Sequence, residues 1–294
     1  MIQIENEQLT VQIDPLGAQM HSIKRNAAGL EYLWQGDPKS WKRQAPVLFP
    51  FVGRLKDDQY EYQGKVYHQT QHGFARDREF KVVEQSSERV VFELRDDEKT
   101  RAAFPFAFVL TIAYQLDEDR LLVSYRVENP SNDQTLIYAL GAHPGFNVPV
   151  DEQGSFETTQ FSVSPAIDYQ QVKLVAPGPF NDLEHPAVLH MQQSIQLDHE
   201  LFGEDALIFA TKGMPFTATL TEPQTNHGVH VQVNGAPFVG VWSPYPAQAN
   251  LVCVEPWWGI ADSIHSDGRL EDKQVMSRLA PGKHEDYAFA IQPF

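Results

Sequence analysis

Two short motifs contain residues that could exchange protons with a bound ligand. In His143-Pro144-Gly145-Phe146-Asn147, the proline stiffens the backbone beside an imidazole, whose proton affinity lies near neutral pH. In Cys253-Val254-Glu255-Pro256-Trp257-Trp258-Gly259, a carboxylate adjoins two tryptophans, and apolar surroundings raise its proton affinity. His143 is therefore a candidate general acid and Glu255 a candidate general base. Each local sequence fits a turn-capping histidine or a carboxylate at the edge of the core equally well.

Three other motifs place a polar side chain beside glycine or an apolar run, where it could hold a ligand. Arg54 follows Phe-Pro-Phe-Val-Gly, His72 precedes Gly-Phe, and Asp205 precedes the apolar run Ala-Leu-Ile-Phe-Ala. All three types can hydrogen-bond to hydroxyl groups. The faces of Trp257 and Trp258 would suit the C–H faces of a sugar ring. Taken singly, each of the three polar residues fits an ordinary structural role better.

Other patterns argue against several classes of site. His227 and His230 have a spacing that could hold a metal on a turn, but no third ligand follows at a recognisable spacing. Cys253 is the only cysteine, which excludes an intrachain disulfide and a metal site built on several thiolates. The glycine-rich motifs of hydrolase elbows, nucleotide sites and dinucleotide sites are missing. We expect neither a metal nor an organic cofactor.

Alternation of apolar and polar residues dominates the chain and predicts half-buried antiparallel strands. We expect hairpin turns at 85–88 and 117–119 and one short helix within 96–103, before Pro105. Many short strands and the absence of a βαβ pattern predict an all-β fold, a large antiparallel sandwich with very little helix and a single domain over residues 1–294. The predicted strands are 9–13, 80–84, 89–94, 108–116, 120–127, 135–140, 206–210, 216–221, 229–233, 238–242, 251–254 and 287–291.

Composition narrows the possible partners and location. The formal charge of −16 predicts no nucleic-acid partner, because a polyanion would be repelled. The chain has no apolar run of about 18 residues that could span a membrane, and Met1–Thr10 lacks the features of a signal peptide. With a single cysteine, these features predict a soluble cytoplasmic protein. We expect a small molecule as its partner and a monomer or homodimer as its state.

Taken in order, Gly-Arg after Phe-Pro-Phe, His-Gly-Phe, His-Pro-Gly-Phe-Asn and Glu-Pro-Trp-x-Gly resemble the motifs of the aldose 1-epimerase, or galactose mutarotase-like, family. The similarity spans nearly the whole chain and is greatest to the LacX-like branch. It implies a large antiparallel β-supersandwich, in agreement with the strand pattern. It also implies an enzyme that interconverts the anomers of a free hexose such as galactose or glucose, without metal or cofactor.

The resemblance assigns roles to individual residues. It implies that His143 is the general acid, that Glu255 is the general base, and that Arg54 and His72 hold the sugar near the reacting centre. Asp205 corresponds less securely to an acid that binds hydroxyl groups, because its flanking sequence is weakly patterned. The reaction opens a cyclic hemiacetal and recloses it on the other carbonyl face, for which one base and one acid suffice.

Three alternatives remain open. A hexose-6-phosphate epimerase would use the same acid and base and add cations, for which Lys56, Arg76 and Arg78 are available. A non-catalytic carbohydrate-binding protein would need neither His143 nor Glu255. A glycosidase would need a second carboxylate about 5–9.5 Å from the first, and only Glu255 has a strong context.

Overall fold

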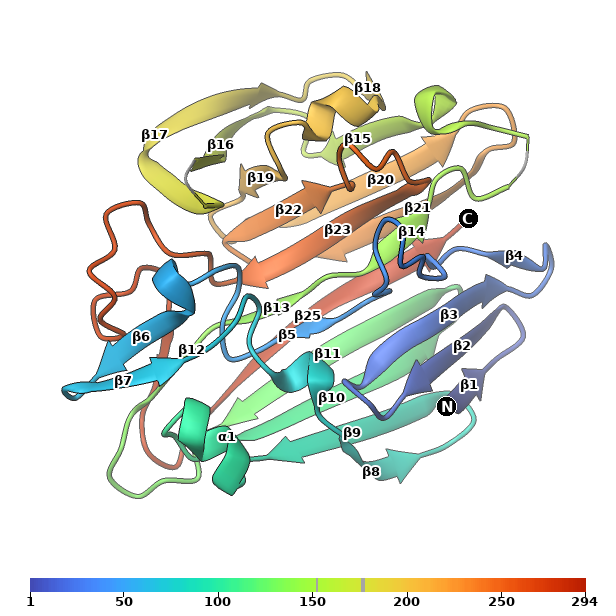
Figure 1. Ribbon diagram of the computed structural model, residues 1–294. Coiled ribbons are helices and arrows are strands. Elements are labelled where there is room, and N and C mark those ends of the chain that lie inside the picture. Colours follow the sequence, from blue (N-terminus) through green and yellow to red (C-terminus); the bar gives the residue numbers. More distant parts are fainter. Residues whose placement is uncertain (152, 176–177) are drawn as a thin grey trace.

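Two large antiparallel sheets form most of the computed structural model, which describes residues 1–151, 153–175 and 178–294 (Figure 1). In order, the nine-stranded sheet contains β18 (Ile195–Gln196), β15 (Gln160–Ser164), β20 (Phe216–Glu222), β21 (His227–Val233), β25 (His284–Pro293), β11 (Arg120–Glu128), β10 (Val109–Asp117), β9 (Arg89–Arg95) and β8 (Lys81–Gln85). The eight-stranded sheet contains β17 (Phe180–His190), β16 (Asp168–Val175), β19 (Leu207–Ala210), β22 (Phe238–Trp242), β23 (Leu251–Trp258), β13 (Leu140–Ala142) and β5 (Val47–Leu48), with β14 (Gly145–Asn147) also paired to β23.

Smaller elements complete the architecture. A four-stranded sheet is formed by β1 (Ile2–Glu5), β2 (Leu9–Asp14), β3 (Gln19–Arg25) and β4 (Leu30–Glu31), and two-stranded sheets by β6 (Gln59–Tyr62) with β7 (Lys65–His68) and by β12 (Leu136–Tyr138) with β24 (Ser277–Leu279). The helical segments are α1 (Glu98–Ala103) and the 3₁₀ turns η1 (Lys56–Asp58), η2 (Ala75–Asp77), η3 (Phe156–Thr158) and η4 (His199–Phe202). None of the helices in the described ranges is long and apolar enough to cross a membrane.

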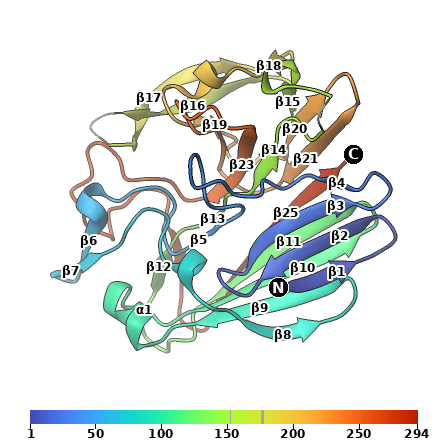
Figure 2. The ribbon, with the colours of Figure 1, turned by 45° about the vertical axis from the view of Figure 1, so that its right-hand side comes forward.

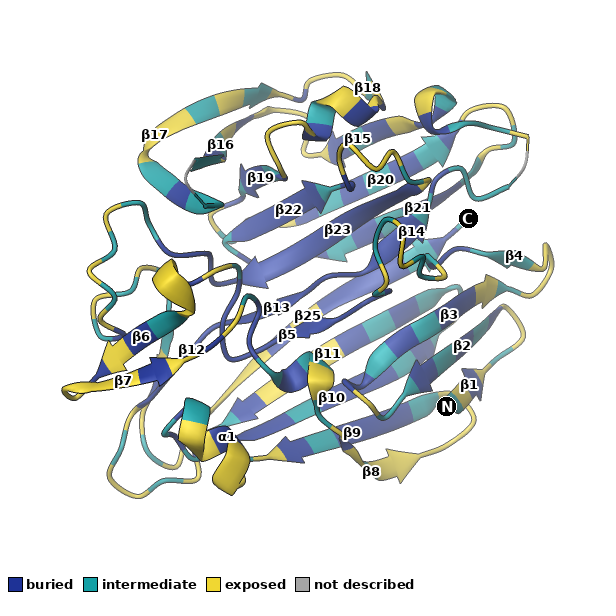
Figure 3. Cartoon of the chain, in the orientation of Figure 1, coloured by how far each residue is buried: buried dark blue, intermediate teal, exposed yellow. Residues whose placement is uncertain are grey.

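The apolar core lies between the layers. The small sheet of β1–β4 covers the β8–β11 end of the nine-stranded sheet in both views (Figures 1 and 2), and Tyr114 of β10 donates a hydrogen bond to the carbonyl oxygen of Ala18. β2 alternates buried and partly exposed residues, as expected for a strand with one face in the core. β23 instead is buried along its full length (Figure 3). This central strand is therefore covered on both faces.

The strand pattern of the sequence is confirmed for most of the chain. Ten of the twelve predicted strands match observed strands within three residues at each end, and the two expected hairpins join β8 to β9 and β10 to β11. The short helix is confirmed as α1, whose first turn Asp97 caps through the backbone N–H of Thr100.

Two strand predictions need correction. The run 135–140 is divided between β12 and β13, which join different sheets. The strand predicted at 251–254 continues through Pro256 to Trp258, so Glu255 lies inside β23 and does not follow it. Proline usually ends a central strand because it lacks a backbone N–H. Here the N–H groups of the neighbouring residues keep the pairing with β22 and β13.

Candidate active site

A cavity of about 390 Å³ opens against the eight-stranded sheet and contains Glu255 and His143. Its floor includes side chains from β19, β22 and β23, and its walls come from the segments around Trp41, Gly53 and His72. A volume of this size falls within the usual range of about 300–1,000 Å³ for small-molecule sites. Six of the seven residues that the sequence singled out for sugar chemistry line it or contact it: Arg54, His72, His143, Asp205, Glu255 and Trp257.

Glu255 reaches the cavity because of its position in the β23 ladder. It pairs with Gly240 of β22, and a Cβ atom at Gly240 would lie 2.7 Å from the indole ring of Trp257. The glycine therefore leaves the space in which Trp257 packs. Two residues along the same strand face, Trp257 donates its Nε1–H to Oε2 of Glu255 at 3.2 Å. The carboxylate is thus held by a neighbour on its own strand.

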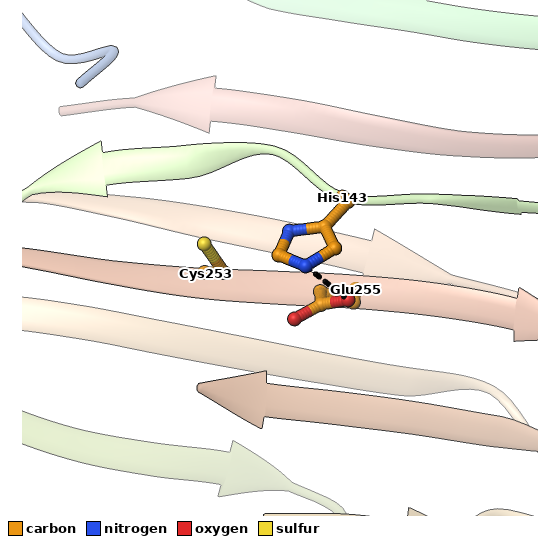
Figure 4. A group of neighbouring side chains, drawn as sticks. All are labelled: His143, Cys253 and Glu255. Carbon is orange, nitrogen blue, oxygen red and sulfur yellow. Dashed lines mark ion pairs between the residues drawn. The ribbon is translucent and has the colours of Figure 1, made fainter. Parts of the chain in front are cut away.

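His143 reaches Glu255 because the strand opposite β23 is interrupted. Gly141 of β13 pairs with Trp257 and Gly145 of β14 pairs with Cys253, which leaves His143 and Pro144 between the two short ladders. The imidazole Nε2 lies 3.2 Å from Oε2 of Glu255 (Figure 4). Both side chains are almost fully buried. The stiff corner expected from Pro144 is the feature that places the candidate acid against the candidate base.

Burial opposes charge on both members of this pair. It raises the pKa of the Glu255 carboxyl well above its ordinary value, while the Trp257 N–H lowers it and the charge of Asp205 raises it further. Burial also lowers the pKa of His143 to about 3. The Nδ1 atom of His143 has no hydrogen-bond partner in the described structure, so a second N–H on the ring would be unsatisfied. Burial therefore favours the neutral forms of both side chains.

His72 presents a fixed hydrogen-bond donor to the cavity. The backbone N–H of Gly53 donates to its Nδ1 at 3.1 Å, and burial, followed by the nearby His143, lowers the pKa of His72 well below its ordinary value. The neutral ring must therefore carry its hydrogen on Nε2. The turn requires Gly73, because a Cβ atom there would lie 2.2 Å from the carbonyl oxygen of Phe49.

Arg54 and Asp205 lie at the opening of the cavity. The guanidinium of Arg54 has no ion-pair partner within the described ranges, and the side chain is exposed at the rim. Asp205 has a φ of 77° and accepts a hydrogen bond from the backbone N–H of Ala206. Loss of water against the cavity wall raises the pKa of Asp205, and the charge of Arg54 opposes this effect. Both side chains are placed to hydrogen-bond to a ligand.

Trp258 needs correction as a sugar contact. Successive residues of a strand point to opposite faces, and Trp258 packs against Tyr125 and Tyr287 at ring-centroid distances of 6.4 Å and 5.1 Å. It does not line the cavity that contains Trp257. Because Pro256 lies inside β23, the alternation of side chains along the strand places Trp257 and Trp258 on opposite faces of the sheet.

Two aromatic residues that the sequence did not single out form a wall of the cavity. The ring of Trp41 stacks on His143 with centroids 4.9 Å apart and planes 24° apart, and Trp242 lies edge-on to His143 at 5.8 Å. Trp242 is the last residue of β22, and its position at the end of a predicted strand could have indicated a role in the site. Trp41 lies in an irregular segment, and only its contact with a residue about a hundred positions away reveals its role.

The cations of the cavity differ from those proposed for a phosphate. Arg76 lines it as expected, together with the unanticipated Lys42 and Arg43. Lys56 instead donates to the carbonyl oxygen of Ser266, and Arg78 forms an ion pair with Asp97. The phosphate hypothesis is therefore corrected with respect to Lys56 and Arg78.

One group of potential metal ligands occurs in the described part of the chain. Ligand atoms of His143, Cys253 and Glu255 lie within 4.8 Å of one another (Figure 4), a donor set that Zn²⁺ accepts. A metal there would occupy the acid and base themselves. His227 and His230 belong to β21 and make separate contacts, to Asp151 at 2.7 Å and Thr219 at 2.8 Å, so they do not form a joint site.

Comparison with known proteins assigns the chain to a family. The sequence model of the family described as aldose 1-epimerase matches residues 1–277. The chain belongs to the aldose 1-epimerase family. Both the chromosomal and the plasmid LacX proteins of Lactococcus lactis subsp. lactis are 32% identical to this epimerase-family chain over 286 residues, which covers 95% of each partner in the comparison.

Solved structures of galactose mutarotase-like proteins have the same fold. A galactose mutarotase related enzyme from Lactobacillus acidophilus has a TM-score of 0.96 at 39% identity, covering 100% of this chain and 97% of that one. A galactose mutarotase-like protein from Lactobacillus casei ATCC 334 has a TM-score of 0.91 at 31% identity, covering 100% of both chains. The all-β prediction and the family resemblance are thereby confirmed, and the chain falls in the epimerase class of isomerases.

Proposed function

We propose that the chain is a mutarotase that interconverts the α and β anomers of a free hexose such as galactose or glucose. The observation that carries this proposal is the distance of 3.2 Å between Nε2 of His143 and Oε2 of Glu255, at the buried end of a cavity with a sugar-sized volume. An acid and a base in direct contact suit a reaction that moves one proton onto a substrate and another off it. The similarity to LacX proteins supports placement in that branch.

The chemistry follows the two protons. Glu255 removes the proton of the anomeric hydroxyl O1 while His143 donates a proton to the ring oxygen, and the bond between C1 and the ring oxygen breaks. The pair thereby changes from carboxylate and imidazolium to carboxyl and neutral imidazole. After rotation about C1–C2, His143 takes its proton back and Glu255 returns one to O1 as the ring closes. Burial favours the second of these states, because it penalises the charged one.

Neighbouring groups favour the charged state of the pair. The stacked ring of Trp41 favours the imidazolium of His143 through its π face, and the Trp257 N–H favours the carboxylate of Glu255. The fixed Nε2–H of His72 can donate to a sugar oxygen near the reacting centre. These contacts stabilise the charged state of the pair inside the cavity.

A hexose-6-phosphate 1-epimerase is the second candidate, and the cations of the cavity favour it. Lys42, Arg43 and Arg76 line the cavity together with Arg54, and four cations exceed what a neutral sugar requires. Against it, Arg43 is held by Asp77 at 2.9 Å and Arg76 by the carbonyl oxygen of Gln71 at 2.6 Å. A neutral hexose therefore remains the first choice. A cytoplasmic location and a monomeric or dimeric state remain predictions.

Polarimetry on freshly dissolved α-D-galactose, α-D-glucose and glucose 6-phosphate tests the proposal. We expect the protein to accelerate equilibration of a neutral hexose above the spontaneous rate. A larger kcat/KM for the phosphate would favour the second candidate, and its loss on Arg54→Ala would identify a phosphate contact. Failure to accelerate any of the three sugars would contradict the enzymatic function.

A further inference from the structure

Cys253 lies beside the His143–Glu255 pair and takes no part in the mechanism proposed above. It precedes Glu255 by two residues in β23, so both side chains point to the same face of the sheet. Gly145 of β14 pairs with Cys253, and a Cβ atom at Gly145 would lie 3.3 Å from the Sγ atom. The only thiol of the chain is therefore buried next to the corner that carries His143.

These three side chains bring a nitrogen, a sulfur and an oxygen donor together. Their ligand atoms lie within 4.8 Å of one another, and Figure 4 shows the thiol and the carboxylate next to the imidazole ring. Nε2 of His143 and Oε2 of Glu255 are 3.2 Å apart. Nitrogen and oxygen ligands of a tetrahedral Zn²⁺ ion are separated by about 3.3–3.4 Å. The first two donors already have this spacing, and the sulfur reaches its position by a shift of about 1 Å or less.

A divalent cation also suits the charge balance of this buried position. Glu255 and Cys253 are almost completely buried, and burial disfavours a net charge. Zn²⁺ would displace the protons of the thiol and the carboxyl to solvent and bind the imidazole in its neutral form. One thiolate and one carboxylate then cancel the two charges of the ion. Mg²⁺ and Ca²⁺ fit this donor set poorly, because they prefer oxygen ligands.

The cavity gives an ion access to the group, because His143 and Glu255 both line it. With Nε2 coordinated, the ring hydrogen of His143 lies on Nδ1, which has no hydrogen-bond partner in the described structure. Zinc sites usually satisfy that second ring nitrogen. We therefore expect reversible binding, weaker than in a structural zinc site.

We propose that His143, Cys253 and Glu255 form an inhibitory site for a soft divalent cation such as Zn²⁺. The ion would occupy Nε2 of His143 and Oε2 of Glu255, the atoms that move the two protons of the sugar. The inhibition therefore rests on the function proposed above, whereas the metal site rests on the geometry of the three side chains. The metal acts here as an inhibitor and not as a cofactor.

The first test measures anomer exchange of the hexose that the wild type accelerates, at increasing Zn²⁺ in a buffer that does not bind metals. We expect Zn²⁺ to slow the reaction, EDTA to restore it, and equal concentrations of Mg²⁺ to have no effect. Cys253→Ala should keep its metal-free activity, because Cys253 does not line the cavity, and should need more than about 10-fold more Zn²⁺ for half-inhibition. The matched control is His227→Gln, which removes a histidine–aspartate contact outside the cavity and should leave the inhibition unchanged.

The second test needs no activity. Co²⁺, which replaces Zn²⁺ in tetrahedral sites, should give the absorption band of a cobalt–thiolate bond with the wild type and not with Cys253→Ala. Absence of this band, no inhibition of the wild type by Zn²⁺, or equal inhibition of the wild type and Cys253→Ala would each overturn the inference and leave the mutarotase function standing. No acceleration of any sugar would contradict the proposed function, and the cobalt band would still decide whether the metal site exists.

Discussion

Trp257 donates its indole N–H to the same carboxylate oxygen of Glu255 that lies 3.2 Å from Nε2 of His143. One carboxylate oxygen therefore contacts both groups, and the indole hydrogen bond favours its charged form. Trp257, two positions along the same strand, therefore lowers the pKa of Glu255, the base of this site. The same strand thus supplies both the base and the group that tunes it.

The Trp257→Phe variant tests this relationship. Without the N–H, the pKa of Glu255 rises further, because the hydrogen bond that lowers it is lost. We expect kcat/KM at pH 7 to fall about 10-fold, the effect of one hydrogen bond to a charged group, and its alkaline limb to move to higher pH. The matched control is Trp258→Phe, on the other face of β23, which should leave the pH profile in place. A pH profile of the Trp257→Phe variant with the same limbs as the wild type would contradict the effect of Trp257 on the pKa of Glu255.

The pH dependence of activity should reflect a pair that shares one proton. The pair takes up a second proton only on His143, and burial lowers the pKa of His143 to about 3. Activity should therefore persist well below pH 6.5. The pair loses its last proton from Glu255, whose pKa is raised. Activity should therefore fall as the pH rises above that pKa. Initial rates from pH 4 to 9, corrected for spontaneous mutarotation, show whether an acid limb occurs above pH 4 and where the alkaline limb lies. An acid limb centred near 6.5 would show an ordinary, solvated histidine.

Removing the buried carboxylate should change stability in a pH-dependent way. The folded protein holds a proton on Glu255 at pH values where the unfolded chain has lost it, so this group makes the fold less stable as pH rises above 4.5. We expect Glu255→Gln to gain stability relative to wild type between pH 5 and pH 8.5, by at most about 1.4 kcal/mol per pH unit. Urea unfolding at both pH values measures the difference. A gap that narrows with rising pH would contradict the raised pKa.

A buried ion pair below the cavity should fix the position of its rim. Nζ of Lys273 lies 2.8 Å from Asp262, whose other carboxylate oxygen accepts the backbone N–H of Lys56 and whose own N–H donates to the carbonyl oxygen of Arg54. Lys273→Met leaves the Asp262 charge buried without a partner and should cost about 3–5 kcal/mol in the free energy of unfolding. It should also raise KM more than it lowers kcat, because Arg54 moves while the acid and base stay.

The double variant Asp262→Asn with Lys273→Met serves as the control for this pair. It removes both charges, so it should recover part of the stability that Lys273→Met loses. Denaturant unfolding of the single and double variants measures how much of the lost free energy of unfolding the double variant recovers. A single variant as stable as wild type would show that the pair has no structural role.

The sequence predicted what depends on local patterns. Alternation located most strands of the two large sheets, and proline beside His143 predicted the stiff corner that now separates β13 from β14. The strands β16 and β17, of 8 and 11 residues, were not predicted, because half of the residues of the first are polar and the second contains Pro186 and little alternation. Tertiary pairing, which a local pattern does not record, stabilises them.

The parts of the site that escaped prediction come from contacts between distant segments. Trp41 stacks on His143 across about a hundred residues, and no motif around Trp41 marks it. Trp258 was assigned to the sugar because of its aromatic face, and the strand was expected to end at Val254. Pro256 favours that interpretation, and only the pairing of Trp257 with Gly141 and Phe238 shows that the strand continues.

The central claim is that His143 and Glu255 perform the proton transfers, and anomer exchange measured by NMR tests it most directly. Exchange cross-peaks between the α and β anomers of glucose or galactose give the rate at equilibrium for wild type, Glu255→Gln and a matched control, Glu222→Gln. Glu222 is also a buried glutamate, but it contacts Thr158 outside the cavity. We predict a loss of about 10²–10⁴-fold for Glu255→Gln and a rate near wild type for Glu222→Gln. Equal rates for wild type and a folded Glu255→Gln protein would contradict the account.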